Sequence, residues 1–234
     1  MTLFTPLDLA ALGFFVGAWI VYAIVIEGTT WGRQGLNSRM NHYREVWMRQ
    51  MLAREMRMVD MQIMAALQNG TAFFASTSLI AIGGALTLMR STDQMLDVLA
   101  MLPFGTTTSH LQWEAKAIGL AIILVYAFFK FAWSYRLFNY VAIMLGATPH
   151  ATEKDRPEAQ AHALRTARLF ETAGRHFNRG QRAFFLALGY LGWFVSPWVL
   201  FVTTAGVVIV MGRRQLGSDS LKALTENPPR PAED

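Results

Sequence analysis

Four runs of apolar residues alternate with more polar stretches along the chain, and each run is long enough to cross a bilayer as a helix. They cover residues 7–26, 71–89, 117–136 and 183–211. The hydrocarbon core of a bilayer is about 30 Å thick, and about 20 residues of α-helix are needed to cross it. The pattern therefore predicts an all-α, polytopic membrane protein with four transmembrane helices, contained in residues 1–216.

The stretch between the first two runs keeps a helical period. Residues 41–69 contain neither glycine nor proline, and this composition predicts one long helix within a loop at 37–69. An apolar stripe follows it at spacings of seven, four and seven residues: Met40, Trp47, Met51 and Met58. Such a stripe is typical of a seam between packed helices. A site for a greasy ligand or a regulated partner is the second interpretation, because thioether side chains adapt to many surfaces.

The stretch before the fourth run, residues 157–182, has two contrasting helical faces. Pro157 suits the first turn of a helix, and one face is apolar: Ala163, Ala167, Phe170, Gly174 and Phe177. The other face is an arginine stripe: Arg165, Arg168, Arg175, Arg179 and Arg182. We predict that this stripe faces anionic lipid headgroups. A specific phosphate, a nucleotide or an acidic protein partner is the alternative.

Small residues in the first two runs favour close approach of helices, since lipid offers little hydrophobic contrast to drive their association. They are Gly13, Gly17, Ala75, Ser76, Ser78, Ala81, Gly83, Gly84 and Ala85. We expect these faces to pack within the chain, with a homo-oligomer as the alternative.

The fourth run is longer than a bilayer needs. As an ideal helix it would extend about 43 Å at 1.5 Å per residue. Pro197 lies near its middle, and a proline inside a helix removes one backbone hydrogen bond and clashes with the preceding turn. The sequence therefore predicts a bend, with Ser196 and Pro197 as a candidate hinge.

The basic residues predict an orientation in the membrane. Residues 27–70 hold six Lys and Arg and residues 146–182 hold seven, whereas residues 90–116 hold two and the tail after residue 211 holds four. Because lysine and arginine concentrate in cytoplasmic loops, we expect both helical loops in the cytoplasm and both termini outside it, in a bacterial inner membrane. The first run lacks the basic start and the cleavage motif of a secretory signal, so it is expected to remain as a spanning helix.

The composition narrows the classes of partner and of chemistry. Hydrophobic residues make up 53% of the chain, its mean hydropathy is +0.27 and its formal net charge is +5. In a membrane protein this surplus predicts contact with the lipid bilayer and its anionic headgroups rather than with nucleic acid. The sequence contains no cysteine, which excludes disulfides, thiolate metal sites and thiol nucleophiles.

Lys130 is the charged residue that lies furthest inside an apolar run, because Arg136 falls at the end of the same run. An ammonium group in hydrocarbon pairs with a carboxylate, reaches toward the interface or lines an ion path. Glu27, at the end of the first run, is the partner we would expect. Lys130, Glu27 and Arg136 are therefore the candidate intramembrane functional or ion-pair residues.

No motif for catalysis, cofactor binding or metal binding is found. The five histidines lie outside the apolar runs: His42, His110, His150, His162 and His176. This position argues against an intramembrane bis-histidine haem. GxSxG, HExxH, P-loop and dinucleotide-binding patterns are absent from the sequence, and His162, Glu171 and His176 lack the spacing of a metal site. We expect no cofactor and no metal, and we name no catalytic residue.

Three local sequences resemble a family of uncharacterised multi-pass membrane proteins, domain of unknown function 599. They are Asn69-Gly70-Thr71-Ala72-Phe73-Phe74-Ala75-Ser76-Thr77; Lys130-Phe131-Ala132-Trp133-Ser134 with Arg136 and Asn139-Tyr140; and Phe177-Asn178-Arg179-Gly180. The resemblance implies a four-span membrane domain over nearly the whole chain, and it supplies no catalytic residue, substrate or cofactor. The tail at 217–234 falls outside it, and its polar, proline-rich sequence predicts disorder.

These observations leave two functions open. We favour a non-enzymatic accessory or scaffold component of a membrane complex, whose methionine-rich and arginine-striped helices contact a membrane-protein partner. The alternative is a small oligomeric transporter or channel for an ion or an anionic metabolite, with Lys130, Arg136 and the predicted hinge along its path. An enzyme acting on lipid ranks third.

Overall fold

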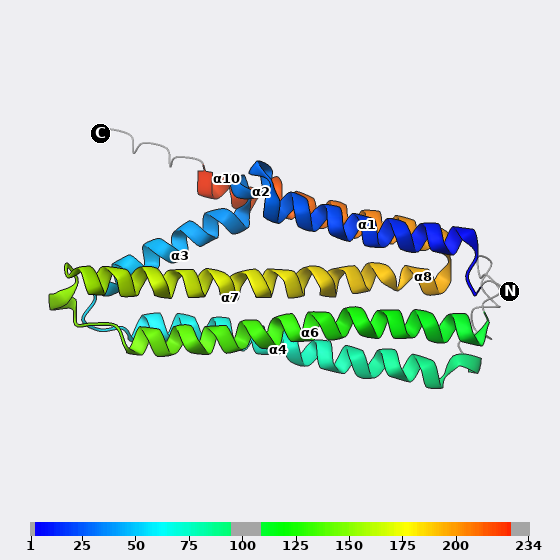
Figure 1. Cartoon of the computed structure of the whole chain (residues 1–234), viewed down its shortest axis with the longest axis horizontal. Coiled ribbons are helices and arrows are strands. Elements are labelled where there is room, and N and C mark those ends of the chain that lie inside the picture. The colour runs from blue at the N-terminus through cyan, green and yellow to red at the C-terminus, as the bar shows by residue number, and fades with distance from the viewer. Residues whose placement is uncertain (1–2, 95–108, 226–234) are drawn as a thin grey trace, which may run out of the picture.

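The computed structural model describes residues 3–94 and 109–225, and these fold into an elongated helical bundle (Figure 1). Its long helices are α1 (Pro6–Gly28), α3 (Leu36–Leu52), α4 (Met58–Arg90), α6 (His110–Gly146), α7 (Pro157–Tyr190) and α9 (Pro197–Leu216). Shorter elements join them: α2 (Thr30–Gln34), the 3₁₀ turn η1 (Ala151–Glu153), α8 (Gly192–Val195) and α10 (Asp219–Thr225). The all-α class predicted from the sequence is confirmed.

Four helices in the described part of the chain are long and apolar enough to cross a membrane: α1, α4, α6 and the segment Pro197–Leu224. Two of them are longer than a bilayer needs, since α4 has 33 residues and α6 has 37, or about 50 and 55 Å. The bundle therefore has two halves. We call the half that contains α1, α8 and α9, with the parts of α4, α6 and α7 beside them, the outer half. The inner half contains α3 and the ends of α4, α6 and α7 that extend past α1 (Figure 1). These names refer to the bundle itself.

Each half has its own apolar core. In the inner half, the buried residues are Met48, Met51, Leu52, Met64, Leu137, Phe138, Val141, Leu145, Ala159, Ala163, Ala167, Phe170 and Ala173. In the outer half, aromatic side chains such as Phe15, Trp113, Tyr190 and Trp193 join leucines and alanines of α1, α4, α6 and α9. The predicted apolar face of residues 157–182 is thus buried at Ala163, Ala167 and Phe170. It packs against α3 and α6.

The structure corrects the predicted span at 183–211. Its first residues belong to α7, which ends at Tyr190, and α8 follows. At Ser196 the backbone is extended, with φ −164° and ψ 161°, and α9 begins at Pro197 and runs back beside α7. The hydroxyl of Thr203 donates to the carbonyl of Gly189 at 2.7 Å between these antiparallel helices.

Ser196 and Pro197 therefore form a helix start rather than a bend inside one helix. The Ser196 hydroxyl accepts a hydrogen bond from the Val199 amide at 3.2 Å, which caps the new helix. Pro197 occupies its first turn, where a missing N–H costs nothing.

This reversal gives α1 and α9 the same direction. Near the start of both helices, Trp193 Nε1 donates to Asp8 Oδ1 at 2.8 Å. At their other end, the side chain of Gln215 lies against Gly35, just after α2. The sequence predicts that both termini share one side of the membrane, whereas α1 begins and α9 finishes at opposite ends of the outer half (Figure 1).

The single helix predicted for residues 41–69 is wrong, because the chain breaks between Leu52 and Met58. The turn is held by Asp60, which is fully buried. Its Oδ1 accepts hydrogen bonds from Trp47 Nε1 at 2.6 Å and from Arg54 Nη1 at 2.5 Å. Folding α3 back in this way buries Met51 of the predicted stripe, while Met58 is exposed.

The glycines predicted to bring helices together are also not the ones that do so. A Cβ atom on Gly13, Gly17, Gly83 or Gly84 would meet no atom within 4 Å. In contrast, a Cβ on Gly180 would lie 2.8–3.0 Å from three ring atoms of Phe131. Gly180 thus marks a close contact between α6 and α7, whereas Gly13, Gly17, Gly83 and Gly84 meet no neighbouring helix.

The tail after Leu216 is partly helical, because α10 covers Asp219–Thr225. The disorder predicted for 217–234 is therefore wrong for these residues. Residues 226–234 lie outside the described part of the chain.

We predict that Gly180→Ala destabilises the protein, because the new methyl group would overlap a Phe131 ring that is fully buried. Overpacking of this kind costs about 1–3 kcal/mol, and the apparent Tm in detergent should fall by several degrees. Gly84→Ala is the matched control, since its methyl group enters open space. Equal losses from both substitutions would contradict the packing described.

Candidate anion-binding cleft

A polar cleft lies where α1 and α9 finish, at the boundary between the two halves of the bundle. It consists of two adjoining hollows of about 320 and 180 Å³. Both are lined by Ile26 at the end of α1, Asn37 of α3, and Asn178 and Arg182 of α7. The larger hollow extends toward α2 and the smaller one toward α9.

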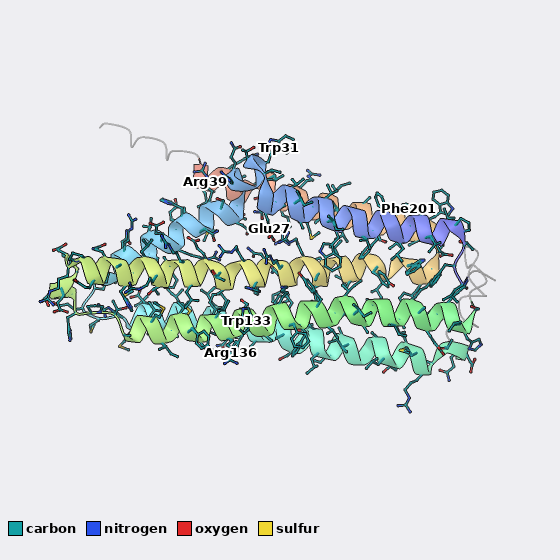
Figure 2. The ribbon with its side chains drawn as sticks, viewed as in Figure 1. Glu27, Trp31, Arg39, Trp133, Arg136 and Phe201 are labelled. Atoms are coloured by element: carbon teal, nitrogen blue, oxygen red, sulfur yellow. The ribbon has the colours of Figure 1, made fainter. Side chains whose placement is uncertain are left out.

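An ion-pair cluster lines the larger hollow, and its Glu27 lies between α1 and α7 (Figure 2). The carboxylate of Glu27 accepts from Arg179 Nε at 3.0 and 3.1 Å and from Arg179 Nη2 at 2.5 Å. It also accepts a hydrogen bond from Arg182 Nη2. Hydrogen bonding to this carboxylate raises the pKa of Arg179. Only 9% of Arg182 is exposed, so its charge depends on Glu27 for compensation.

Positive charge is in excess around this cluster. The two hollows are lined by five arginines and one carboxylate: Arg33, Arg175, Arg179, Arg182, Arg214 and Glu27. Arg175 pairs with Glu171 at 3.8 Å, a carboxylate outside the lining. Because like charges repel unless counter-charges lie among them, this arrangement favours the entry of an anion.

Two buried donors in the cleft lack hydrogen-bond partners among the described residues. They are Nη1 of Arg182 and Nε2 of Gln215, and both residues line the smaller hollow. Gln215 is 8% exposed. An unpaired buried donor costs about 1–3 kcal/mol, so a ligand that supplies acceptor oxygens would be stabilised here. Phosphate and carboxylate groups match planar guanidinium donors best.

The arginine stripe predicted from the sequence is divided by the fold. Arg175, Arg179 and Arg182 line the cleft, whereas Arg165 and Arg168 lie further along α7 toward the inner half and are exposed. Ser196 and Pro197 lie at the opposite end of the outer half, beyond α8, and are not part of the cleft.

Of the three candidate intramembrane residues, only Glu27 belongs to the cleft, and its partners differ from the one we expected. Its carboxylate pairs with Arg179 and Arg182. The ammonium of Lys130 instead lies 5.0 Å from the ring centre of Tyr126. Arg136 is exposed on the other side of α6, where its Nε donates to Tyr140 at 2.7 Å (Figure 2).

Several cleft residues could not be chosen from the sequence. Arg33, Asn37, Arg214 and Gln215 come from three separate segments that meet only because α9 runs parallel to α1. The sequence contains one sign of this arrangement. Arg213 and Arg214 follow Met211 directly, and basic residues are unusual in a segment predicted to lie outside the cytoplasm.

A second cluster of buried polar side chains lies at the end of the outer half where α1 begins. The sequence did not predict it. Lys116 Nζ donates to the carbonyl of Trp193 at 2.9 Å, and the indole of Trp193 donates to Asp8. All three residues are buried. They join α1, α6 and α8, while Phe15 and Tyr190 pack together next to them at 5.4 Å.

Residues 3–94 and 109–225 contain no group of three or more His, Cys, Asp or Glu side chains that could hold a metal ion.

We predict strong coupling between Glu27 and Arg182. In a double-mutant cycle, the losses of stability from Glu27→Gln and Arg182→Gln should fall short of additivity by about 1 kcal/mol or more, because each single change leaves a partner unpaired. The cycle of Glu27→Gln with Lys130→Gln should show less than half that coupling. Apparent Tm values in detergent measure both. Larger coupling to Lys130 would mean that the pairing is misassigned.

A family model described as a protein of unknown function, DUF599, matches residues 10–220 of the chain. This range contains every residue that lines the cleft. No curated protein and no solved structure matches the chain.

Proposed function

The chain belongs to the DUF599 family, and we propose that it is an integral membrane protein that binds an anionic ligand, one bearing phosphate or carboxylate groups, in the cleft around Arg182. The observation that carries this proposal is the pair of buried, unpartnered donors on Arg182 and Gln215. Together with the excess of arginine over carboxylate in the cleft, they supply both the hydrogen bonds and the charge that such a ligand needs.

We further propose that ligand binding serves an accessory or scaffold component of a membrane complex. Helix α3 supplies Asn37, Ser38 and Asn41 to the cleft, and its other end packs in the core of the inner half through Met48 and Met51. A ligand in the cleft would therefore contact both the membrane helices and a helix that stands outside the bilayer. This arrangement suits a protein whose interaction with a partner depends on the ligand.

The packing of the outer half supports this role over the alternative of a transporter or channel. Between the cleft and the outer end, Phe15 and Tyr190 lie in contact, and Tyr190 also packs on Trp193 at 5.4 Å. A path for an anion would have to displace these buried rings.

We propose a bacterial inner membrane as the location, with the inner half of the bundle in the cytoplasm and α7 making an additional crossing through residues 183–195. With α9 returning to the inner side, its basic tail joins the two basic loops. The three cytoplasmic segments then hold six, seven and four Lys and Arg, whereas residues 90–116 on the other side hold two. This orientation agrees with the positive-inside rule better than one with both termini outside the cytoplasm. The exposed tryptophans Trp198, near the start of α9, and Trp31, after α1, suit the two interfaces.

We predict that inorganic phosphate stabilises the detergent-purified protein more than chloride at the same ionic strength. A ligand that binds only the folded state stabilises it by RT ln(1 + [L]/Kd), about 2.7 kcal/mol at a hundred times Kd. Arg214→Gln should weaken the phosphate effect by about tenfold in Kd, because it removes one charge-assisted contact. The readout is the apparent Tm across a phosphate titration.

The matched control for this titration is Arg165→Gln, which removes an exposed arginine of the same stripe outside the cleft. It should leave the apparent Kd unchanged. An equal loss in both variants would indicate general attraction of anions to a basic surface, and the cleft would then not be the site.

We predict that the C-terminal helix faces the cytoplasm. The natural chain contains no cysteine, so a single cysteine can report its own side of the membrane. In spheroplasts, a membrane-impermeant maleimide should label Asp93→Cys, beyond α4, and should label Ser220→Cys, in α10, only after permeabilisation. Labelling of the Ser220→Cys variant in intact spheroplasts would contradict this orientation.

A further inference from the structure

An apolar groove of about 370 Å³ opens between α1 and α6 in the outer half of the bundle. Its lining is Val16, Trp19, Ile20, Ile122, Ile123 and Tyr126. Three of these side chains are well exposed, with Val16 at 45%, Ile20 at 53% and Ile122 at 64%. Both helices are candidate membrane spans. In a bilayer the groove is therefore filled with hydrocarbon, because water has no place at that depth.

A lysine, Lys130, lies next to the inner end of this groove. Tyr126 forms the inner end of the lining and stacks edge-on against Trp19 at 5.8 Å. The ammonium of Lys130, one helical turn further along α6, lies 5.0 Å from the centre of the same Tyr126 ring. Among the described residues Lys130 forms no ion pair, since Glu27 is engaged by Arg179 and Arg182. The groove thus leads to a cation that lacks a protein counter-charge.

The positive charge of Lys130 also acts on His176 of α7. Burial, followed by the charges of Lys130, Arg179 and Arg175, lowers the pKa of the His176 imidazole, and Glu27 opposes that shift. His176 packs on Trp133 at 6.4 Å. Lys130 and Arg179 both act on the His176 imidazole, so the end of the groove lies near the Glu27 cluster.

We propose that this groove and Lys130 form a binding site for an anionic phospholipid of the cytoplasmic leaflet. One acyl chain lies along α1 and α6, and the phosphate is held by Lys130, about 6 Å beyond Tyr126 at 1.5 Å per residue. Anionic headgroups attract basic side chains at this interface, and an apolar groove that continues into a cation fits an amphiphile rather than a soluble anion. The site is separate from the cleft of the proposed function.

Native mass spectrometry of the protein, released from vesicles of phosphatidylglycerol and phosphatidylcholine in equal amounts, tests the site. The natural sequence should retain phosphatidylglycerol in preference to phosphatidylcholine. Lys130→Gln should lower that preference about fivefold, the factor expected from one basic contact at the surface. Arg136→Gln is the matched control, because it removes an exposed cation of the same helix whose Nε contacts Tyr140 and which projects about 120° away from Lys130; it should retain the preference.

A second variant tests the groove itself. Ile122→Trp fills it from an exposed position that the core does not use, and it should reduce retention of both lipids. This variant also serves if Lys130→Gln proves unstable. Unchanged preference in Lys130→Gln, an equal loss in Arg136→Gln, or full retention in Ile122→Trp would overturn the proposal. Displacement of the lipid by millimolar inorganic phosphate would also overturn it, since the ligand would then be the free anion. Arg214→Gln, which tests the cleft, should leave lipid retention unchanged.

Discussion

The structure depends on the need to keep a charged helix away from lipid. Helix α7 carries Arg175, Arg179 and Arg182 where it enters the outer half, and unpaired charge in hydrocarbon is expensive. In the fold, α7 lies between other helices, with α4 and α6 on one side and α1 and α9 on the other (Figure 1). The apolar helices then face lipid and shield the polar one, which explains why the most central helix is absent from the candidate membrane spans.

The cleft follows from this arrangement. Where α7 leaves the shelter of α1 and α9, its arginines meet the ends of those two helices and the start of α3. Glu27 compensates two of the charges, and the remaining arginines have no matching carboxylate in the lining. The same boundary carries Lys130 on the other side of α7's ion-pair cluster. A protein that concentrates cations at this boundary has the charge that anions need.

The sequence predicts the apolar helices well, because bilayer thickness imposes a length and composition that survive any change of packing. It does not predict the reversal at Ser196, because residues 183–211 are continuously apolar and a short capped turn leaves no mark on hydropathy. The break after Leu52 depends on hydrogen bonds from Trp47 and Arg54 to the Asp60 carboxylate. Local helix propensity does not predict these contacts. The arginine stripe was visible as a pattern, but its partner Glu27 lies 152 residues from Arg179, and only the fold brings them together.

The late position of α9 in the chain has a consequence for biogenesis. Arg214 and Gln215 are among the last cleft residues to be synthesised, and they complete a wall whose other parts are made much earlier. A chain that contains α1, α4, α6 and α7 but not α9 therefore still lacks one wall of the cleft beside the arginines of α7. Packing of α9 completes that side, so the residues that line the cleft come together only after α9 has been synthesised.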